Sequence, residues 1–257
     1  MTYSVFTKPW NLSMDELGEK VSKLGFDGIE LPVRPGFAVT PEEIKEKLPE
    51  AVKTLAKYGV KITSVAGNTD ELTISACGDN GISLIRTMVY VGEENYLEVE
   101  ARTQKQYEEL IPLLDKHGVK LGLQNHCDAF VCNAMGIKHL IEKFDPKYIG
   151  AVWDCAHNAL NGEDPEMGLD IVWSHLCMIN FKNAYWKVMN GPESDITVWQ
   201  HYWTTGKRGR ADWARIAANL KKRNWSGTLC ITNEYSDEAN TDKWIAEDIA
   251  YAKSLFE

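Results

Sequence analysis

Polar side chains that can bind cations or move protons stand at the ends of four apolar stretches of this 257-residue chain. Carboxylate, imidazole, amine and amide groups serve general acid–base catalysis, charge stabilisation and cation binding. One such residue alone more often caps a turn or makes a structural hydrogen bond. Because burying several of them without a function is costly, the joint pattern predicts a functional cleft. These residues are Gln124, His126, Asp154, His157, Asn180, Lys182 and Glu234.

Eight short apolar stretches alternate with amphipathic, helix-forming stretches. This alternation predicts an α/β fold, a single (β/α)8 TIM barrel that occupies residues 1–257 as one domain. A doubly wound open sheet is the alternative, but FTKPWN after the first strand is not a glycine-rich phosphate turn. The expected strands cover 3–8, 26–32, 60–66, 84–91, 119–125, 148–154, 176–182 and 228–234.

Helix signals separate most of these strands. Ser13 with Glu16 three residues later predicts the start of the first helix. Thr40 followed by Pro41 predicts the start of the second, which Pro49 is expected to kink or split. The other expected helices cover 95–117, 133–143, 165–174, 211–223 and 240–255.

The alternation of side chains along a strand predicts which residues face the barrel interior. Leu121 and Leu123 should pack under helices, Gln124 should point inward, and Asn125 should brace the strand end. Cys177 is expected to face the helices. Since the carboxyl ends of barrel strands converge on one mouth, the inward polar residues should meet there. This inward set is Glu30, Gln124, His126, Asp154, Asn180, Lys182 and Glu234.

The longest stretch without an expected element covers 184–209 and is rich in Trp and Tyr. Long loops in compact domains are usually functional, and this one follows the seventh strand. Its rings suit the apolar faces of a sugar, and the alternative is that they bury the loop itself or a subunit interface. The candidate stacking residues are Trp10, Trp186, Trp199, Tyr202 and Trp203. Lys207, Arg208 and Arg210 are candidate anion ligands or solvated charges.

The composition of the chain limits the classes of partner that we expect it to bind. A net charge of −9 argues against a protein that tracks nucleic-acid phosphates. No apolar run of about 18 residues and no signal peptide in MTYSVFTKPW are found, so we expect no membrane partner and a cytoplasmic location. The six cysteines form no CxxC pair, which favours free thiols in a reducing compartment.

Six phrases, in the order of the expected strands, carry a family resemblance. They are LGFDGIELPV (24–33), LGLQNH (121–126), VWDCAHNAL (152–160), INFKNA (179–184), GRADW (209–213) and NEY (233–235). Together they resemble the sugar phosphate isomerase/epimerase family, the xylose-isomerase-like TIM barrels. The resemblance implies proton transfer on a small sugar or keto-sugar.

The resemblance also implies one divalent cation at the barrel mouth. The family's ligand positions fall on Gln124, Asp154, Asn180 and Glu234, where relatives usually have Glu, Asp, His and Glu. Mn²⁺ or Mg²⁺ accepts amide oxygens, but its affinity should fall with the lower ligand charge. A metal-free site in which Lys182 supplies the positive charge is equally open.

The expected function is a sugar or keto-sugar isomerase, epimerase or lyase that uses Glu234 as base. His126 or His157 would protonate a leaving oxygen, and Lys182 would stabilise the enolate. Gln124 cannot titrate, so a two-base epimerisation needs another group. The expected substrate-binding residues are Gln124, Glu30, Trp10, Trp186 and Arg208.

Two other functions are alternatives to this enzyme activity. A non-catalytic carbohydrate-binding or partner protein would have kept the barrel and lost the usual metal site. DNA endonuclease chemistry is disfavoured by the depleted ligand set and the charge of −9. A small sugar or keto-sugar is therefore the expected partner, and a homo-oligomer is an open option.

Overall fold

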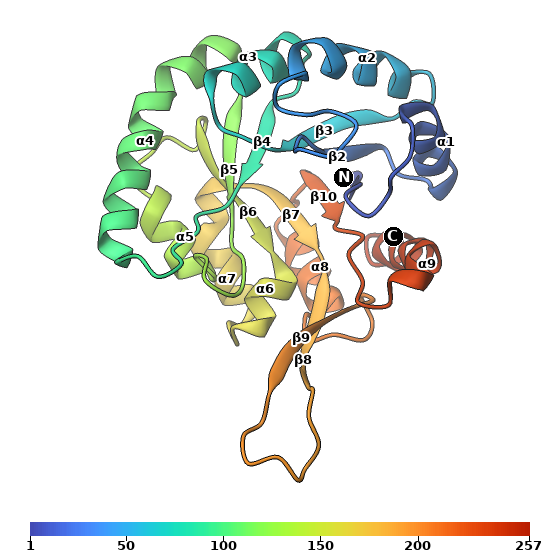
Figure 1. The fold of residues 1–257 in the computed structure, drawn as a ribbon, viewed down its shortest axis with the longest axis vertical. Coiled ribbons are helices and arrows are strands. Elements are labelled where there is room, and N and C mark those ends of the chain that lie inside the picture. Colours follow the sequence, from blue (N-terminus) through green and yellow to red (C-terminus); the bar gives the residue numbers. More distant parts are fainter.

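Eight parallel strands close into a barrel in the computed structural model, which describes residues 1–257 (Figure 1). The strand order around the barrel is β1-β10-β7-β6-β5-β4-β3-β2, so every strand neighbours the next barrel strand in the chain, and the last, β10, closes onto β1. The prediction of a single TIM barrel is confirmed. The barrel strands are β1 (Thr2–Phe6), β2 (Gly28–Pro32), β3 (Lys61–Ala66), β4 (Leu84–Thr87), β5 (Lys120–Gln124), β6 (Ile149–Asp154), β7 (Leu176–Phe181) and β10 (Thr228–Ile231).

Helices surround the barrel (Figure 1). They are α1 (Met14–Leu24), α2 (Ile44–Ala56), α3 (Glu71–Asp79), α4 (Tyr96–His117), α5 (Ala134–Ile141), α6 (Cys155–Leu160), α7 (Pro165–Val172), α8 (Trp213–Lys222) and α9 (Thr241–Ser254), with short 3-10 turns η1 (Trp173–His175) and η2 (Glu238–Asn240). None of them is long and apolar enough to cross a membrane. The sequence did not indicate α3 or the single-turn helix α6.

The starts of α1 and α2 can be compared with the helix caps predicted from the sequence. Ser13 and Glu16 form the expected capping box of α1. The prediction for α2 was wrong, because Thr40 accepts a hydrogen bond from the Glu43 N–H in a turn that precedes the helix. Pro49 does not split α2, which runs from Ile44 to Ala56 with this proline in its interior, where it removes one hydrogen bond.

The core has two layers. Leu121 and Leu123, which were expected to face outward, pack between strands and helices in a large cluster. A small cluster fills the barrel itself, and it consists of Phe6, Ala66, Leu84, Val152, Met178 and Cys230. The outward prediction for Cys177 was wrong. The pairing of β6 with β7 shifts between Ala151 and Val152, and Cys177 packs against the inner cluster.

A β-hairpin occupies much of the stretch expected to be irregular. Strands β8 (Asn183–Val188) and β9 (Trp199–Thr204) pair in antiparallel register, with Tyr185 opposite Tyr202. Figure 1 shows the hairpin projecting away from the barrel. Its aromatic and β-branched residues are typical of strands. The signal was therefore present in the sequence.

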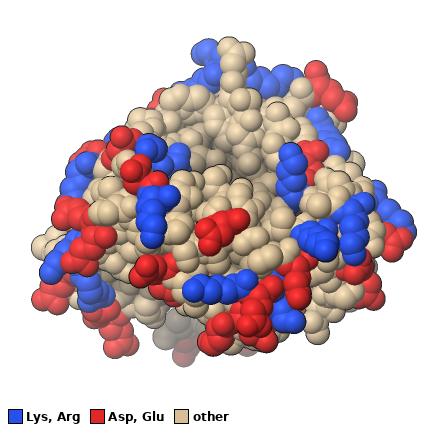
Figure 2. Space-filling view, turned by 90° about the horizontal axis from the view of Figure 1, so that it is seen from above, with Lys and Arg blue, Asp and Glu red and all other residues tan.

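Charged residues of both signs are interspersed on the face shown in Figure 2, around a central neutral area. The view agrees with the mixed composition of 28 basic and 37 acidic residues. On this face no basic stripe stands out.

Candidate active site at the carboxyl end of the barrel

A chain of buried polar groups crosses the barrel beneath its mouth. The Arg86 Nε donates to both carboxylate oxygens of Glu30, at 2.8 and 2.9 Å, and the Ser64 hydroxyl donates to the same carboxylate at 3.1 Å. Arg86 also donates to the Gln124 side-chain oxygen, and the Gln124 amide nitrogen donates to Asp154 Oδ2 at 2.9 Å. Since a guanidinium only donates, Gln124 must direct its oxygen to Arg86 and its nitrogen to Asp154. These side chains are buried, so we name them the sealed network.

Asp154 ends this network at the start of α6. Its Oδ1 accepts the backbone N–H groups of Ala156 at 3.0 Å and His157 at 3.2 Å, which fixes it as the helix cap. Asn125 accepts from the Asp154 N–H at 2.7 Å and donates to its carbonyl at 3.0 Å, so the predicted brace is present. Burial raises the pKa of the Asp154 carboxyl to about 6, although Lys182, the cap and Asn180 oppose this shift.

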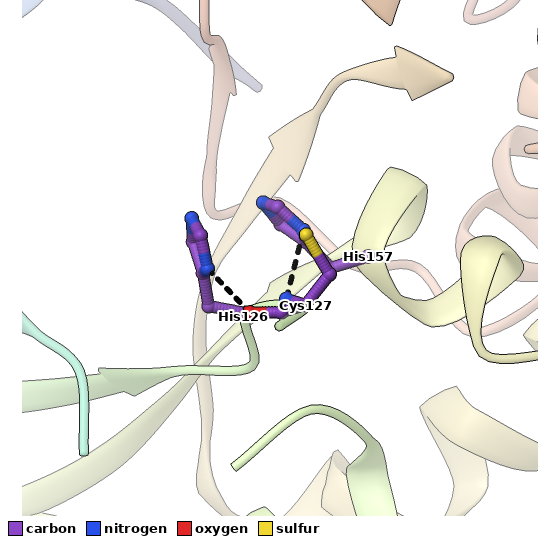
Figure 3. A group of neighbouring side chains, drawn as sticks. All are labelled: His126, Cys127 and His157. Carbon is purple, nitrogen blue, oxygen red and sulfur yellow. Dashed lines mark hydrogen bonds between the residues drawn. The ribbon is translucent and has the colours of Figure 1, made fainter. Parts of the chain in front are cut away.

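Figure 3 shows two imidazoles and a thiol, those of His126, His157 and Cys127. The His157 Nε2 lies 3.8 Å from Asp154 Oδ2. The rings of His126 and His157 are 4.1 Å apart. His157 Nδ1 accepts the backbone N–H of Cys127 at 3.1 Å, so the neutral ring carries its proton on Nε2. That buried N–H has no hydrogen-bond partner. Burial lowers the pKa of His157 well below its ordinary value, and the charge of Lys182 lowers it further.

The rim of the mouth carries a different set of charges. Lys182 Nζ lies 2.7 Å from one oxygen of Glu234, and Lys8 Nζ lies 2.7 Å from the other. Burial favours a raised pKa for Glu234, but the two ammonium groups outweigh it and hold the pKa well below the ordinary value. The indole of Trp203 covers Lys182, with Nζ 3.7 Å from the ring centroid. We name Lys8, Lys182 and Glu234 the rim triad.

A cavity of about 680 Å³ opens beside the rim triad. Lys8 and Glu234 line it together with Trp10 and Trp203, so two of the predicted aromatic residues lie at the mouth. The Trp10 indole N–H donates to Asp242 at 2.9 Å, which holds this side chain in the wall. Volume and lining suit a small polar ligand with apolar faces.

Other residues predicted to bind substrate lie elsewhere. Trp186 donates from its indole to the Leu160 carbonyl at 3.0 Å, which ties the hairpin to α6. Arg208 lies over Trp244, 5.3 Å from the ring centroid, at a second cleft. Glu30 and Gln124 belong to the sealed network, so a sugar would reach them only after that network opened.

The four predicted metal ligands do not fit a divalent cation in this arrangement. Gln124 presents an amide N–H to Asp154, and so does Asn180, at 3.4 Å. Glu234 is neutralised by two lysines. Cations of the protein therefore hold the Gln124 and Glu234 oxygens that a metal would need, and the Asn180 Oδ1 is left buried without a hydrogen-bond partner. The donor set favours the metal-free option, and cation binding stays a prediction that elemental analysis can test.

The His126, Cys127 and His157 ligand atoms lie within 4.8 Å of one another, but they do not fit a cation either. The lone pair of His157 Nδ1 already accepts a backbone N–H, and its Nε2 carries the proton. Burial, with help from Asp128, raises the pKa of the Cys127 thiol to about 12. A ligand thiol must ionise, so this environment opposes metal binding.

Two residues of the site were missed by sequence reasoning. Arg86 interrupts the apolar run LIRTMVYV, and an arginine inside a barrel strand signals a buried partner. Lys8 is the last residue of the first expected strand, 3–8, where side chains reach the mouth. Both residues could therefore have been identified from their positions in the sequence.

The closed parallel barrel and the polar mouth define the chain as an α/β barrel of the kind that places reactive groups at strand ends. A family model described as xylose isomerase-like TIM barrel matches residues 19–255. The protein belongs to this family. A comparison with curated proteins finds no match.

Solved structures with the same fold cover nearly the whole chain. The D-psicose 3-epimerase of Clostridium cellulolyticum H10, solved with D-tagatose, is 12% identical over 100% of both chains, with a TM-score of 0.73. The probable 3-DHS dehydratase AsbF of Bacillus anthracis is 14% identical, covers 98% of this chain and 99% of its own, and has a TM-score of 0.75. The 3-keto-D-glucoside 4-epimerase YcjR of E. coli is 12% identical over 99% of both chains, with a TM-score of 0.73. At these identities the likeness establishes the fold.

Proposed function

We propose that the protein is an enzyme that moves a proton next to the carbonyl of a small sugar or keto-sugar, as an isomerase or lyase. The Lys182–Glu234 pair beside the cavity of about 680 Å³ carries this proposal. A base next to a cation is the arrangement that enolisation requires, because the carbon acid loses its proton while charge develops on the carbonyl oxygen. The epimerases and the dehydratase of the same fold support this reaction class.

Each rim residue takes one role. Glu234 removes the proton from the carbon beside the carbonyl, and the electron pair moves onto the carbonyl oxygen. Lys182 donates a hydrogen bond to that oxygen, and Trp203 shields this contact from water. Transfer of the neighbouring hydroxyl proton to the former carbonyl oxygen, with return of the removed proton to the former carbonyl carbon, completes an isomerisation. In an elimination the oxygen on the next carbon leaves as water or alcohol after it takes the proton that Glu234 removed, while His157 donates a hydrogen bond from Nε2. His126 donates from Nδ1 to the Cys127 carbonyl at 2.9 Å and burial lowers its pKa, so its neutral ring has no proton to give.

Glu234 must gain basicity when the substrate binds. In the ligand-free arrangement two lysines lower its pKa, and so weak a base would act slowly. The Lys8 side chain is 45% exposed, whereas that of Lys182 is 6% exposed. A sugar that displaces Lys8 into solvent would leave Glu234 with one cation, which raises its pKa at the moment of reaction.

The second candidate function is carbohydrate binding without chemistry. The lowered pKa of Glu234 and the neutral amides around Asp154 favour it, because both reduce the number of groups able to move protons. Such a protein would bind sugars in the same cavity and release them unchanged.

Proton exchange in D₂O separates the two candidates. Ketohexoses and 3-keto-glycosides are incubated with the protein, and deuterium entry beside the carbonyl is followed by NMR, with calorimetry for binding. We expect deuterium entry with the wild type and a loss of about 10²- to 10⁴-fold with Glu234→Gln. The matched control Glu238→Gln removes a carboxylate from the wall of the same cavity and should retain exchange.

Each result decides between the candidates. Sugar binding without deuterium entry or product would establish the non-catalytic alternative. Full exchange by Glu234→Gln would exclude Glu234 as the base. Equal losses in Glu234→Gln and Glu238→Gln would indicate that the cavity carboxylates bind the sugar rather than move its proton.

A further inference from the structure

The β8–β9 hairpin exposes apolar side chains far from the mouth. Ile196 is 79% exposed, Trp199 58%, Val198 53% and Met189 51%. A two-stranded hairpin alone is marginally stable in water, and exposed apolar groups that cluster mark interaction surfaces. We name residues 183–204 the arm. The turn of the arm, Met189–Val198, is named the tip. The exposure of the tip indicates a partner that covers it.

A cleft of about 410 Å³ lies at the other end of the arm. The rings of Tyr185 and Tyr202 form one wall, with centroids 5.3 Å apart. Arg208 and Trp244 form the facing wall, where the guanidinium lies over the indole. The foot cleft therefore has aromatic walls, with three cations, Lys187, Arg208 and Lys243, over its rings and one carboxylate, Asp237, in its lining.

The tip and the foot cleft are complementary in charge. Between Val188 and Gln200 the chain carries Glu193 and Asp195, and no lysine or arginine. From Thr205 to Arg210 it carries three cations and no acid. Glu193, Asp195 and all three cations are exposed. An acidic, apolar projection and a cationic, aromatic recess on one chain form a self-complementary pair.

We propose that the arm pairs with the arm of a second copy about a two-fold axis, so that each tip seats in the foot cleft of the other copy. The tip cannot fill its own cleft, because the strands β8 and β9, each about 20 Å long, separate the two. A two-fold axis repeats every contact, which suits one patch that holds both halves of the interaction. The arm and the segment after it span Asn183–Arg210, and Tyr235, Asp237 and Trp244 complete the foot cleft, a set close to the 20–30 residues a side of a stable interface.

The test is the oligomeric state of the full chain over a micromolar dilution series, measured by sedimentation velocity and light scattering. We expect a dimer. Ile196→Asp should raise the dissociation constant about 100-fold, and Asp195→Lys or Arg208→Asp alone about tenfold. The combination of Asp195→Lys with Arg208→Asp should restore the dimer, because it exchanges the two charges across the interface.

Two matched controls use exposed positions outside the arm. Leu97→Asp alters a side chain that is 69% exposed, and Glu42→Lys reverses an exposed charge near α2. Both should dimerise as the wild type does, and circular dichroism checks that every variant is folded. A monomeric wild type would overturn the proposal. So would a dimer unaffected by Ile196→Asp, or a charge exchange that fails to restore pairing. None of these readouts depends on catalytic activity.

Discussion

The sealed network and the rim triad use the same kinds of side chain in opposite ways. In the sealed network Glu30 meets Arg86 with almost no solvent contact, and its donors and acceptors are largely matched. In the rim triad Glu234 meets two lysines beside an open cavity, and one of these lysines is 45% exposed. The first arrangement has no free group for a ligand, whereas the second can exchange a lysine for one.

The difference shows that depth in the barrel separates structural from reactive polar residues. Both sets point inward from their strands, so direction alone does not distinguish them. Glu30 and Gln124 lie below the mouth, where removal of one partner leaves a buried polar group unpaired. Glu234 lies at the level where water and ligand enter. We therefore expect substitutions in the sealed network to alter stability and substitutions in the rim triad to alter activity.

The largest expected effect follows from Arg86→Met, which leaves the Glu30 carboxylate buried without its cation. Breaking a buried pair in this way costs about 3–5 kcal/mol, and the free energy of unfolding should fall by that amount in urea titrations. The double variant Glu30→Leu with Arg86→Met should recover most of it, because it leaves no uncompensated charge.

An exposed pair provides the control for Arg86. Arg102 donates to both oxygens of Glu94 at 2.8 and 3.0 Å. This is the same kind of ion pair as Arg86 with Glu30, but it is exposed to water. Arg102→Met should change the unfolding midpoint little, since solvent screens such pairs. If Arg86→Met were as mild as Arg102→Met, the sealed network would have no structural role and the comparison would fail.

Lys182→Met tests the rim triad and should give the next largest effect. The variant keeps the Glu234 carboxylate and removes the cation proposed to hold the enolate oxygen. We expect proton exchange in D₂O to fall about 10²- to 10³-fold, with an unfolding free energy close to that of the wild type. A stability loss as large as that of Arg86→Met, with exchange retained, would place Lys182 with the structural residues.

The sequence predicted the barrel well because its signals are local. The apolar strands and their carboxyl-terminal polar residues follow from alternation within each strand, which fixes Gln124, Asp154 and Glu234 as inward. The brace by Asn125 followed from its outward position at a strand end. These inferences need no knowledge of the neighbouring strand.

The missed features depend on contacts between strands. Cys177 turned inward because β6 and β7 shift register, and no pattern within β7 reveals that shift. The family's metal positions were matched residue by residue, but only the structure shows that Arg86 fixes the orientation of Gln124 and that Lys8 and Lys182 share Glu234. The partners of a polar group, rather than its identity, decided what it can bind.

The smallest expected effect concerns a third buried carboxylate, Asp248, which has neutral hydrogen-bond donors in place of a cation. It accepts from the Gly206 N–H at 2.8 Å and from the Tyr235 hydroxyl at 2.9 Å, below the foot of the arm. Burial raises its pKa from 3.8 to about 6 despite these donors. The folded protein thus keeps this proton up to about pH 6, whereas the unfolded chain releases it near 3.8.

The free energy of unfolding should therefore fall as the pH rises between these two values, by at most about 3 kcal/mol for a shift of two units. Asp248→Asn removes the titrating group, so the difference in stability between wild type and variant should change across this interval and stay constant above it. Glu42→Gln, which removes an exposed carboxylate, should show no such interval. Urea titrations at pH values from 4 to 7 measure these differences. A difference that does not vary with pH would mean that Tyr235 and Gly206 fully offset the burial of the Asp248 carboxylate. The contrast between cation-paired and neutrally bonded carboxylates would then disappear.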